Sequence, residues 1–523
     1  MKSMLSSSLS SNVASACDRQ REPGAAAHGL VKPNISDPAG STVEAAMNRS
    51  NKISPKLPLK NSHSEHWEQI WRDSSPSWGG YYHRWLQRVY GFVIPKGARV
   101  LELGCGSGDL LASLQPEYGL GIDFAPSAVE KARTRHTNLR FEVMDAEALK
   151  LGDERFDFII LSDLVNDLWD VQTMLAGLRP YCHPGTRLVL NFYSHLWQMP
   201  LQMAQRLRVA TPTLSQNWLT LADMRNLLTL EGFELLRAWS EMVVPLHVPG
   251  ANWVNRFLAK VIPFRWLALA NFMVGRPVGK SATGEPTCTV VVAARNEEGH
   301  IAQLFDRIPE LGPQTEIIFV EGNSTDDTYG AIERAIAAHP ERNCCLLKQS
   351  GKGKGDAVRA GFAAATGDIL MILDADMTVP PEDLPRFYEA IASGKGEFIN
   401  GVRLVYPMED EAMRFFNLVG NKFFAAVFSW LLGQPIRDTL CGTKVIWRKD
   451  YERLVANRAY FGNFDPFGDF DLLFGAAKLN LKILELPIRY HSRRYGETNI
   501  SRWSHGVLLL RMVIFASRRI KFF

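Results

Sequence analysis

Short apolar runs, each ended by polar or charged residues, recur along two long stretches of the chain. The first stretch holds five runs, at 100–103, 119–123, 139–144, 156–161 and 187–192. The second holds runs at 287–294, 316–320 and 369–376, and helical patterns separate the runs of both stretches. Runs of this length bounded by turn residues are typical of buried strands. The pattern therefore predicts two α/β domains, each built on a doubly wound parallel sheet.

Two carboxylates end the last of these runs. Five apolar residues lead into Asp374 and Asp376. A buried strand cannot keep two carboxylates without a compensating partner, and open parallel sheets bind ligands at the carboxyl ends of their strands. The pair is therefore predicted to hold a divalent cation that binds a nucleotide diphosphate. The alternative is that both aspartates cap the next helix.

Other charged residues follow the neighbouring runs of the second stretch. Glu297 and Glu321 come after its first two runs, and Lys352 and Lys354 lie in a glycine-rich loop before the third. Carboxylates can serve a metal and lysines can bind phosphates. Because the carboxyl ends of parallel strands share one edge of a sheet, we expect these groups to meet at a single site.

A glycine-rich turn follows the run at 100–103. Gly104, Gly106 and Gly108 let the backbone turn sharply into a helix and approach a ligand closely. Glycine spacing alone is a weak signal, but Asp123 ends the next run at a distance suited to binding ribose hydroxyls. The turn is therefore predicted to bind a ligand that contains a ribose.

Chain length, net charge and cysteine content limit the possible classes of function. A chain of 523 residues is too long for one core, so two or three domains are expected. Lys and Arg number 59 against 55 Asp and Glu, and the net charge of +4 gives no case for binding nucleic acid. The seven cysteines are scattered and form no C-x-x-C pair, which indicates reduced thiols in a cytosol-like compartment. No secretory signal is expected at the N-terminus.

Segments of other composition surround the two domains. Residues 1–60 lack apolar periodicity and are predicted to be a disordered tail, and residues 276–286, rich in Gly, Pro, Ser and Thr, are expected to form a linker. Apolar and basic residues interleave at 252–266, which predicts either contact with a membrane surface or packing between domains. The segments 415–433 and 506–517 are expected to be buried or interfacial, because polar residues interrupt both.

Residues 61–275 resemble a class I S-adenosylmethionine-dependent methyltransferase. The motif consists of Glu102, the three glycines that follow it, Asp123 and Asp145. The resemblance implies a Rossmann-like fold that binds S-adenosylmethionine. In that case the glycines would line the methionine and the ribose, and Asp123 would bond the ribose hydroxyls. Asp145 with Ala146 would contact the adenine, and Glu102 would support the loop or bind the amino group through water.

The acceptor of the methyl group stays open. No Asn/Asp-Pro-Pro-Tyr motif follows the fourth run, which argues against methylation of adenine or glutamine. Asn166 and Asp167 lie where small-molecule methyltransferases often carry a histidine, so the sequence assigns no general base.

Residues 287–504 resemble an inverting family 2 glycosyltransferase of the GT-A fold, in the polyprenyl-phosphate (dolichol-phosphate) branch. That branch opens with Pro-x-Tyr-Asn-Glu, and the replacements at Ala293 and Arg295 predict a difference in base recognition. Asp374 and Asp376 match the metal motif of the family, with Mg²⁺ or Mn²⁺ as the expected ion. The donor would be bound by residues at the strand ends, in the glycine-rich loop and in a segment at 485–498 that resembles the closing motif of the branch: Ala293, Arg295, Glu297, Glu321, Lys354, Asp374 and Arg493.

Two later motifs extend this resemblance. Residues 438–444 are similar to the acceptor-side motif of the family. Inverting transfer needs a carboxylate that takes the acceptor proton, unless the acceptor is a phosphate that is already deprotonated. Asp469 is the first candidate for this base and Asp471 the second, and the alternative is that one of them caps the helix near 472. Asn499 stands where the branch commonly has a lysine, which weakens the case for a polyprenyl phosphate acceptor.

Together these features predict a bifunctional transferase. It would move methyl groups from S-adenosylmethionine, and sugars from a nucleotide-sugar to a lipid-phosphate, glycolipid or other glycan-precursor acceptor. The expected location is the cytoplasm with peripheral contact at the inner face of the membrane, where 505–523 would form an interfacial helix. Two alternatives stay open: a first domain that is only a cofactor-binding scaffold, and a nucleotide-binding regulator without activity.

Overall fold

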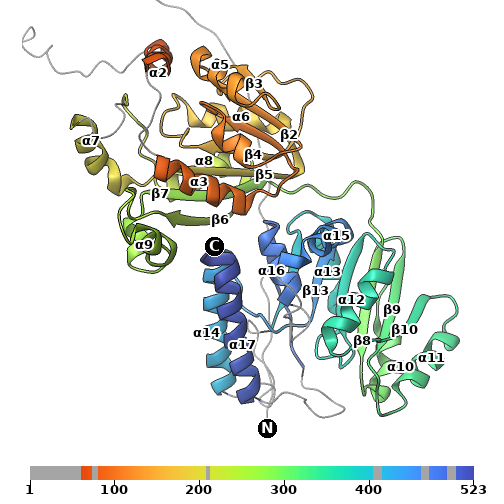
Figure 1. Ribbon diagram of the computed structural model, residues 1–523. Helices are drawn as coiled ribbons and strands as arrows, with labels where there is room; N and C mark the ends of the chain where they lie inside the picture. The colour runs from red at the N-terminus through yellow and green to blue at the C-terminus, as the bar shows by residue number, and fades with distance from the viewer. Residues whose placement is uncertain (1–59, 74–79, 208–212, 404–414, 461–469, 492–501) are drawn as a thin grey trace, which may run out of the picture. The chain divides into compact units, whose positions relative to one another are not determined.

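The computed structural model describes residues 60–73, 80–207, 213–403, 415–460, 470–491 and 502–523 (Figure 1). They belong to one compact unit, Pro58–Phe523. The tail predicted at 1–60 lies outside the described residues except for Lys60, which begins a helix. Within the described ranges no helix has both the length and the apolar character needed to cross a membrane.

The first sheet has seven strands in the order β3-β2-β1-β4-β5-β7-β6. Strands β1 to β5 are parallel, as predicted, and β7 runs antiparallel to its neighbours β5 and β6. The antiparallel edge was not predicted, and β7 extends into the segment expected to be a linker. The strands are β1 Arg99–Leu103, β2 Tyr118–Asp123, β3 Arg140–Val143, β4 Phe156–Ser162, β5 Cys182–Tyr193, β6 Phe233–Glu241 and β7 Ala270–Pro277.

Local signals set the ends of several helices around this sheet. Pro126 begins α5, Asp170 accepts a hydrogen bond from Thr173 N (3.0 Å) ahead of α6, and Thr220 forms a capping box with Asp223 at α8. The α-helices are α2 Lys60–Asp73, α3 Gly80–Val93, α4 Asp109–Ser113, α5 Pro126–Arg135, α6 Val171–Leu178, α7 Gln198–Arg206, α8 Leu221–Leu230 and α9 Ala251–Phe257. Short 3₁₀ turns are η1 Arg179–Tyr181, η2 His195–Trp197, η3 Leu258–Lys260 and η4 Phe264–Leu267.

The second sheet also has seven strands, in the order β10-β9-β8-β11-β13-β12-β14. Strands β10, β9, β8 and β11 are parallel, and β13 runs antiparallel to β11 and β12, an orientation that no run in the sequence indicated. The run predicted at 369–376 ends as a strand at Asp374. The strands are β8 Cys288–Ala294, β9 Thr315–Glu321, β10 Asn343–Lys348, β11 Ile369–Asp374, β12 Phe398–Val402, β13 Lys444–Trp447 and β14 Ile483–Pro487.

Helices accompany every strand connection of the second sheet. Helix α12 begins directly after Gly353, whose φ of 84° ends the glycine-rich loop. Helices α14 and α17 lie side by side (Figure 1). The helices are α10 Glu298–Arg307, α11 Thr328–Ala338, α12 Lys354–Ala364, α13 Leu384–Ala392, α14 Phe415–Leu432, α15 Arg448–Ala456, α16 Phe470–Lys478 and α17 Arg502–Ala516, with the turns η5 Pro381–Asp383, η6 Arg458–Tyr460 and η7 Ser517–Lys521.

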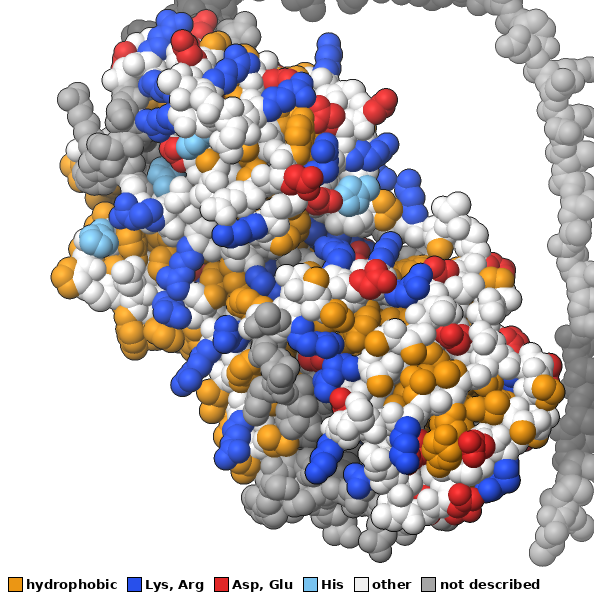
Figure 2. Space-filling model, turned by 45° about the vertical axis from the view of Figure 1, so that its right-hand side comes forward, with side chains coloured by type: hydrophobic (Ala, Val, Ile, Leu, Met, Phe, Trp, Pro, Cys, Tyr) orange, Lys and Arg blue, Asp and Glu red, His pale blue; other side chains and the backbone are white. Residues whose placement is uncertain are grey.

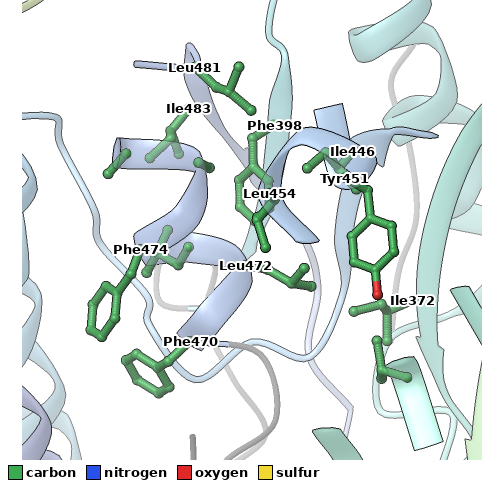
Figure 3. Packing of buried hydrophobic residues seen from close by; sticks show 14 of the residues in the cluster. Ile372, Phe398, Ile446, Tyr451, Leu454, Phe470, Leu472, Phe474, Leu481 and Ile483 are labelled. Carbon is green, nitrogen blue, oxygen red and sulfur yellow. The ribbon is translucent and has the colours of Figure 1, made fainter. Parts of the chain in front are cut away.

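Strand β11 divides two apolar cores. Its side chains alternate, so that Leu370 and Ile372 join one core while Met371 and Leu373 join the other. Figure 3 shows the first core, where Ile372 and Phe398 of the sheet lie among side chains of α15 and α16. Because both faces are covered, β11 can expose polar groups only at its ends.

We expect Phe398→Ala to lower the stability of the second domain by about 3–5 kcal/mol, because the substitution leaves a cavity in a fully buried site. The midpoint of urea or thermal denaturation measures the loss. Phe423→Ala, at a phenylalanine that is 56% exposed, is the matched control and should change stability by about 0.5 kcal/mol or less. Equal losses in the two variants would contradict the packing shown in Figure 3.

Candidate functional sites

In each sheet the strand order reverses at one strand. Strand β1 has β2 and β3 on one side and β4 and β5 on the other, and β8 is flanked in the same way by β9 and β11. Connections therefore leave the central strand in opposite directions, and open α/β sheets bind ligands outside the carboxyl ends at such a point. Both candidate sites are built at these edges.

The glycine-rich turn after β1 depends on positive backbone angles. The φ angles of Gly104, Gly106 and Gly108 are 71°, 50° and 74°, a region that side chains with a Cβ rarely enter. Gly104 N donates to Ile122 O (2.8 Å), which fixes the turn against the end of β2. A Cβ added to Gly106 would overlap the ring of Trp71, so the backbone is also closely approached from α2.

Glu102 and Asp123 support this turn from inside. Glu102 is 2% exposed and accepts a hydrogen bond from Leu111 N (3.1 Å), and burial raises the pKa of its carboxyl to about 8. Asp123 accepts hydrogen bonds from Gly106 N and Ala125 N, both 2.9 Å, and burial raises its pKa as well. Both carboxyls are thus tied to backbone groups of the loops that would enclose a cofactor.

The end of β3 lies beside the end of β2. Met144 N donates to Asp123 O (3.0 Å), and the carboxylate of Asp145 accepts a hydrogen bond from Glu147 N (2.9 Å). Ala146 is buried. The structure therefore brings the residues expected to contact ribose and adenine to neighbouring positions on one edge.

Helix α2 covers part of the glycine-rich turn. Besides the contact of Trp71 with Gly106, Glu68 accepts hydrogen bonds from the Ser127 hydroxyl (2.5 Å) and amide (3.2 Å). Nothing in the sequence indicated that this helix lies over the site, because the contact joins elements far apart in the chain.

A polar cluster at the ends of β4 and β5 was missed by the sequence reasoning. Asp163, with φ 55°, directly follows β4 and accepts hydrogen bonds from the Tyr82 hydroxyl (2.8 Å) and from the Asn191 side-chain amide. The Tyr90 hydroxyl donates to Asn191 Oδ1 (2.7 Å). Burial raises the pKa of Asp163 to about 7, so the cluster presents a carboxyl that can gain or lose a proton near neutral pH.

Asn166 and Asp167, which lie where small-molecule methyltransferases often carry a histidine, have different environments. Asn166 is buried, donates to Asn217 O (2.7 Å) and accepts from Tyr193 N (3.0 Å), so it braces the loop after β4. Asp167 accepts a hydrogen bond from Gln216 (3.1 Å), and burial raises its pKa to about 6.

In the second sheet, strand register aligns the predicted donor residues. Asp374 of β11 pairs with Ala293 of β8, and Ala294 pairs with Glu321 of β9. Arg295 follows directly and is exposed. These residues, which the sequence assigned to one site, are therefore neighbours across three strands.

Asp374 is the centre of this edge. Its carboxylate forms an ion pair with Lys354 at the start of α12, and a Cβ on Gly442 would overlap both of these side chains. Burial acts to raise the pKa of Asp374, but the nearby cations, Lys354 first, outweigh burial and hold the pKa below its usual value. The carboxylate is thus ionised, and the backbone of the predicted acceptor-side motif lies directly against it.

Asp376 lies in the turn after β11. Its Oδ1 accepts hydrogen bonds from the Thr378 amide (3.1 Å) and hydroxyl (2.8 Å). This is a capping interaction, but of the turn rather than of a helix terminus, and it involves one carboxylate oxygen. Across the part of the chain that the structure describes, no three His, Cys, Asp or Glu side chains converge at a distance suited to a metal ion.

Glu297 and Glu321 are more deeply placed than expected for residues that touch a donor. Glu297 is buried and its Oε2 lies 2.8 Å from His300 Nδ1, while Glu321 is buried and accepts a hydrogen bond from Ser324 N (2.5 Å). As placed, both shape the loops around the edge. Lys352 is exposed, and of the two loop lysines it is Lys354 that reaches Asp374.

A second buried ion pair holds the motif at 438–444. Arg403 donates from Nε (2.7 Å) and Nη2 (2.8 Å) to the two oxygens of Asp438, in bidentate geometry. Although burial acts to raise the pKa of Asp438, Arg403 outweighs it and the pKa is lowered. The sequence gave no signal for Arg403, because its partner lies on a separate segment.

Of the two candidate bases, Asp471 is described and Asp469 lies outside the described residues, as does Arg493. Asp471, on α16, lies 3.9 Å from Arg359 and 3.6 Å from Arg458. Arg359 is on α12, five residues after Lys354, a rise of about 7.5 Å along the helix. One helix therefore contacts both Asp374 and Asp471.

Comparison with protein families matches residues 94–227 to a model described as methyltransferase domain, and residues 289–454 to glycosyl transferase family 2. The chain carries a methyltransferase domain and a family 2 glycosyltransferase domain. Both domains are of transferase families. The glycine-rich turn lies in the methyltransferase domain, and the edge around Asp374 lies in the glycosyltransferase domain.

Individual relatives match the glycosyltransferase domain. Two proteins of Haloferax volcanii are each 28% identical: the low-salt glycan biosynthesis hexosyltransferase Agl6, over 44% of this chain and 53% of its own length, and a dolichyl-phosphate hexose transferase, over 43% and 91%. The chain thus spans about half the length of the first relative. A solved structure of glucosyl-3-phosphoglycerate synthase from Mycobacterium tuberculosis with Mn²⁺ and uridine diphosphate is 21% identical, over 45% of this chain and 80% of that one, with a TM-score of 0.33.

The raised pKa of Asp163 predicts a pH-dependent stability. Between the ordinary value of 3.8 and about 7, the folded protein keeps a proton that the unfolded chain releases, so stability falls as pH rises through this window. Asp163→Asn keeps an acceptor oxygen without the charge, so its melting temperature should match wild type below about pH 4 and exceed it by a margin that grows up to about pH 7. The exposed Asp153→Asn is the control. If the difference in melting temperature between Asp163→Asn and wild type does not grow with pH, the raised pKa of Asp163 is contradicted.

Proposed function

We propose that the protein is a bifunctional transferase. The first domain would move a methyl group from S-adenosylmethionine to an acceptor. The second would move a sugar from a nucleotide-sugar, with inversion, to a lipid-phosphate or glycan-precursor acceptor. The observation that carries the proposal is the meeting of Asp374, Lys354 and Gly442 at one edge of the second sheet. An ionised carboxylate, an ammonium group and a closely approaching backbone suit a metal-bound diphosphate.

The donor set fits Mg²⁺ or Mn²⁺ held jointly by protein and substrate. Mg²⁺ is usually bound through one or two carboxylates together with substrate phosphates, without a complete protein cage. Asp374 and Asp376 would supply these carboxylates. When bound, the ion would offset the charge that develops on the leaving diphosphate. Lys354 would add positive charge at the same place, and Ala293, Arg295 and Glu321 would lie around the nucleotide.

The nature of the acceptor decides whether a base is needed. The name of the dolichyl-phosphate hexose transferase relative supports a lipid phosphate, which is already deprotonated and requires no base. For an acceptor hydroxyl, Asp469 would take the proton, with Asp471, which α12 links to the donor edge, as the second candidate. Arg493 keeps its predicted role as diphosphate ligand. We place the protein in the cytoplasm, where nucleotide-sugars and S-adenosylmethionine would both reach it.

Methyl transfer would depend mainly on positioning, because the displacement proceeds in line. Gly104, Gly106 and Gly108 would accommodate the cofactor, with Asp123 on the ribose, Asp145 and Ala146 at the adenine, and Glu102 behind the loop. Asp163 would face the acceptor from the end of β4, where Tyr82 and Asn191 hold its carboxyl in place. A carboxyl that titrates near neutral pH suits an acceptor that loses a proton on methylation.

Asp376→Asn separates a metal ligand from a structural cap. Asparagine keeps the oxygen that accepts from Thr378 but removes the charge, so folding should persist while sugar transfer falls by about 100-fold or more. Transfer is measured with UDP- and GDP-sugars, dolichyl or undecaprenyl phosphate and Mn²⁺, with and without EDTA. Asp383→Asn, on η5, is the control. Full activity in Asp376→Asn would exclude this residue as a ligand.

For the methyltransferase domain, we expect Asp123→Ala to weaken binding of S-adenosylmethionine by about tenfold or more, since it removes a ribose ligand and the bond to Gly106 N. Isothermal titration calorimetry measures the affinity. Asp376→Asn should bind the cofactor as wild type does, because its change lies in the other domain. Unchanged affinity in Asp123→Ala would remove the claim that this domain binds the cofactor through its ribose.

A further inference from the structure

A continuous stretch of apolar side chains lies on the outside of the first domain. All seven residues at 261–267 are exposed, and six of them are apolar. Trp266 is 60% exposed, and Trp253 of α9 adds a second indole that is 59% exposed. We call this set the apolar face, and its members are Trp253, Phe257, Val261, Ile262, Phe264, Trp266 and Leu267. Single exposed apolar residues are common, but a contiguous group of this kind marks an interaction site.

Polar contacts hold the apolar face on both sides. Lys260, just before it, is buried in an ion pair with Glu241, which also accepts hydrogen bonds from Trp85 (3.2 Å) and Trp239 (2.9 Å). After it, the Trp197 indole donates to Leu267 O (2.9 Å). The exposure is therefore a property of a fixed segment, held at one end by the Lys260 side chain on Glu241 of β6 and at the other by the Leu267 carbonyl on Trp197 of η2.

Buried contacts also fix helix α9, which carries Trp253 and Phe257 of the apolar face. Asn255 of α9 is fully buried and accepts hydrogen bonds from Val243 N (2.8 Å) and Val244 N (2.9 Å). Because Asn255 faces inward, the neighbouring side chains of Trp253 and Phe257 are held on the outer side of the helix.

The charge of this region has a single sign. No acidic residue occurs between Glu241 and Glu285, whereas Arg256 and Arg265 are exposed within the apolar face. Helix α17 repeats the pattern, with an exposed stripe of Val507, Leu510 and Ile514 and no acid after Glu497. Hydrophobic and basic side chains gather along the left border of Figure 2, and acidic side chains lie mainly elsewhere.

We propose that the apolar face docks the protein onto a lipid bilayer that carries anionic head groups. Indole rings suit the boundary between head groups and acyl chains, and arginines between them attract anionic lipid. Pairing of this face with a second copy would bring Arg256 and Arg265 against like charges, which disfavours self-association. The protein would lie on the membrane through this segment. The inference goes beyond the proposed function and does not depend on which acceptor the enzyme uses.

The test is cosedimentation of the full chain with vesicles of phosphatidylcholine alone and of phosphatidylcholine mixed with phosphatidylglycerol. We expect binding to the mixed vesicles that weakens with added salt. Trp266→Ser should reduce the partition coefficient by about tenfold or more, because it removes a large apolar side chain from the interface. Trp169→Ser is the matched control, since this tryptophan is 50% exposed and lies outside the apolar face. Trp169→Ser should bind as wild type does.

Three outcomes would overturn the proposal. The first is absence of binding to the mixed vesicles, and the second is equal binding by Trp266→Ser and wild type, which would place the contact elsewhere, as on α17. The third is a dimer in sedimentation velocity that Trp266→Ser dissociates, without vesicle binding, which would make a second copy the occupant. Hydrolysis of nucleotide-sugars without lipid should be unchanged in Trp266→Ser. If the wild-type protein does not hydrolyse nucleotide-sugars, that result counts against the proposed function and leaves the membrane proposal standing.

Discussion

Strands that are covered on both faces can present charge only where they end, and this constraint organises both domains. In β11, Leu370 and Ile372 enter one core and Met371 and Leu373 the other, so the first side chain that can stay ionised is Asp374. In the first sheet the same rule brings functional groups to the turn after β1 and to the residue after β4. Because parallel strands end along one edge, the charged groups of separate strands become neighbours without any local sequence signal.

The carboxyl groups at the two sheet edges have pKa values shifted in opposite directions, and this difference separates the chemistry that each edge can support. Asp374 is partly exposed beside Lys354, whose charge outweighs the effect of burial and keeps the carboxylate ionised. Glu102 and Asp163 have backbone and neutral side-chain partners, so burial prevails and raises the pKa of each. The second edge therefore holds fixed charge, and the first holds groups that can exchange a proton near neutral pH.

The apolar face on the outside of the first domain combines buried, bonded residues with exposed neighbours. Lys260 and Asn255 are buried and bonded, while the side chains at 261–267 are exposed. The sequence offered two readings of 252–266, membrane contact and packing between domains, because its interleaved pattern fits both. Exposure of consecutive side chains at 261–267 is a property of the folded chain, which the pattern alone does not give.

The sequence by itself determined β1 to β5 of the first sheet and β8, β9 and β11 of the second, together with the glycine-rich turn and the paired aspartates after β11, because these depend on local periodicity and on residue-specific backbone freedom. Only the tertiary structure decided that β13 runs antiparallel beside β11, and that Gly442 lies against Asp374. It also decided that Tyr82 and Asn191 hold Asp163. Such contacts join elements distant in the chain, and register and packing fix them, so no short stretch of residues carries their signal.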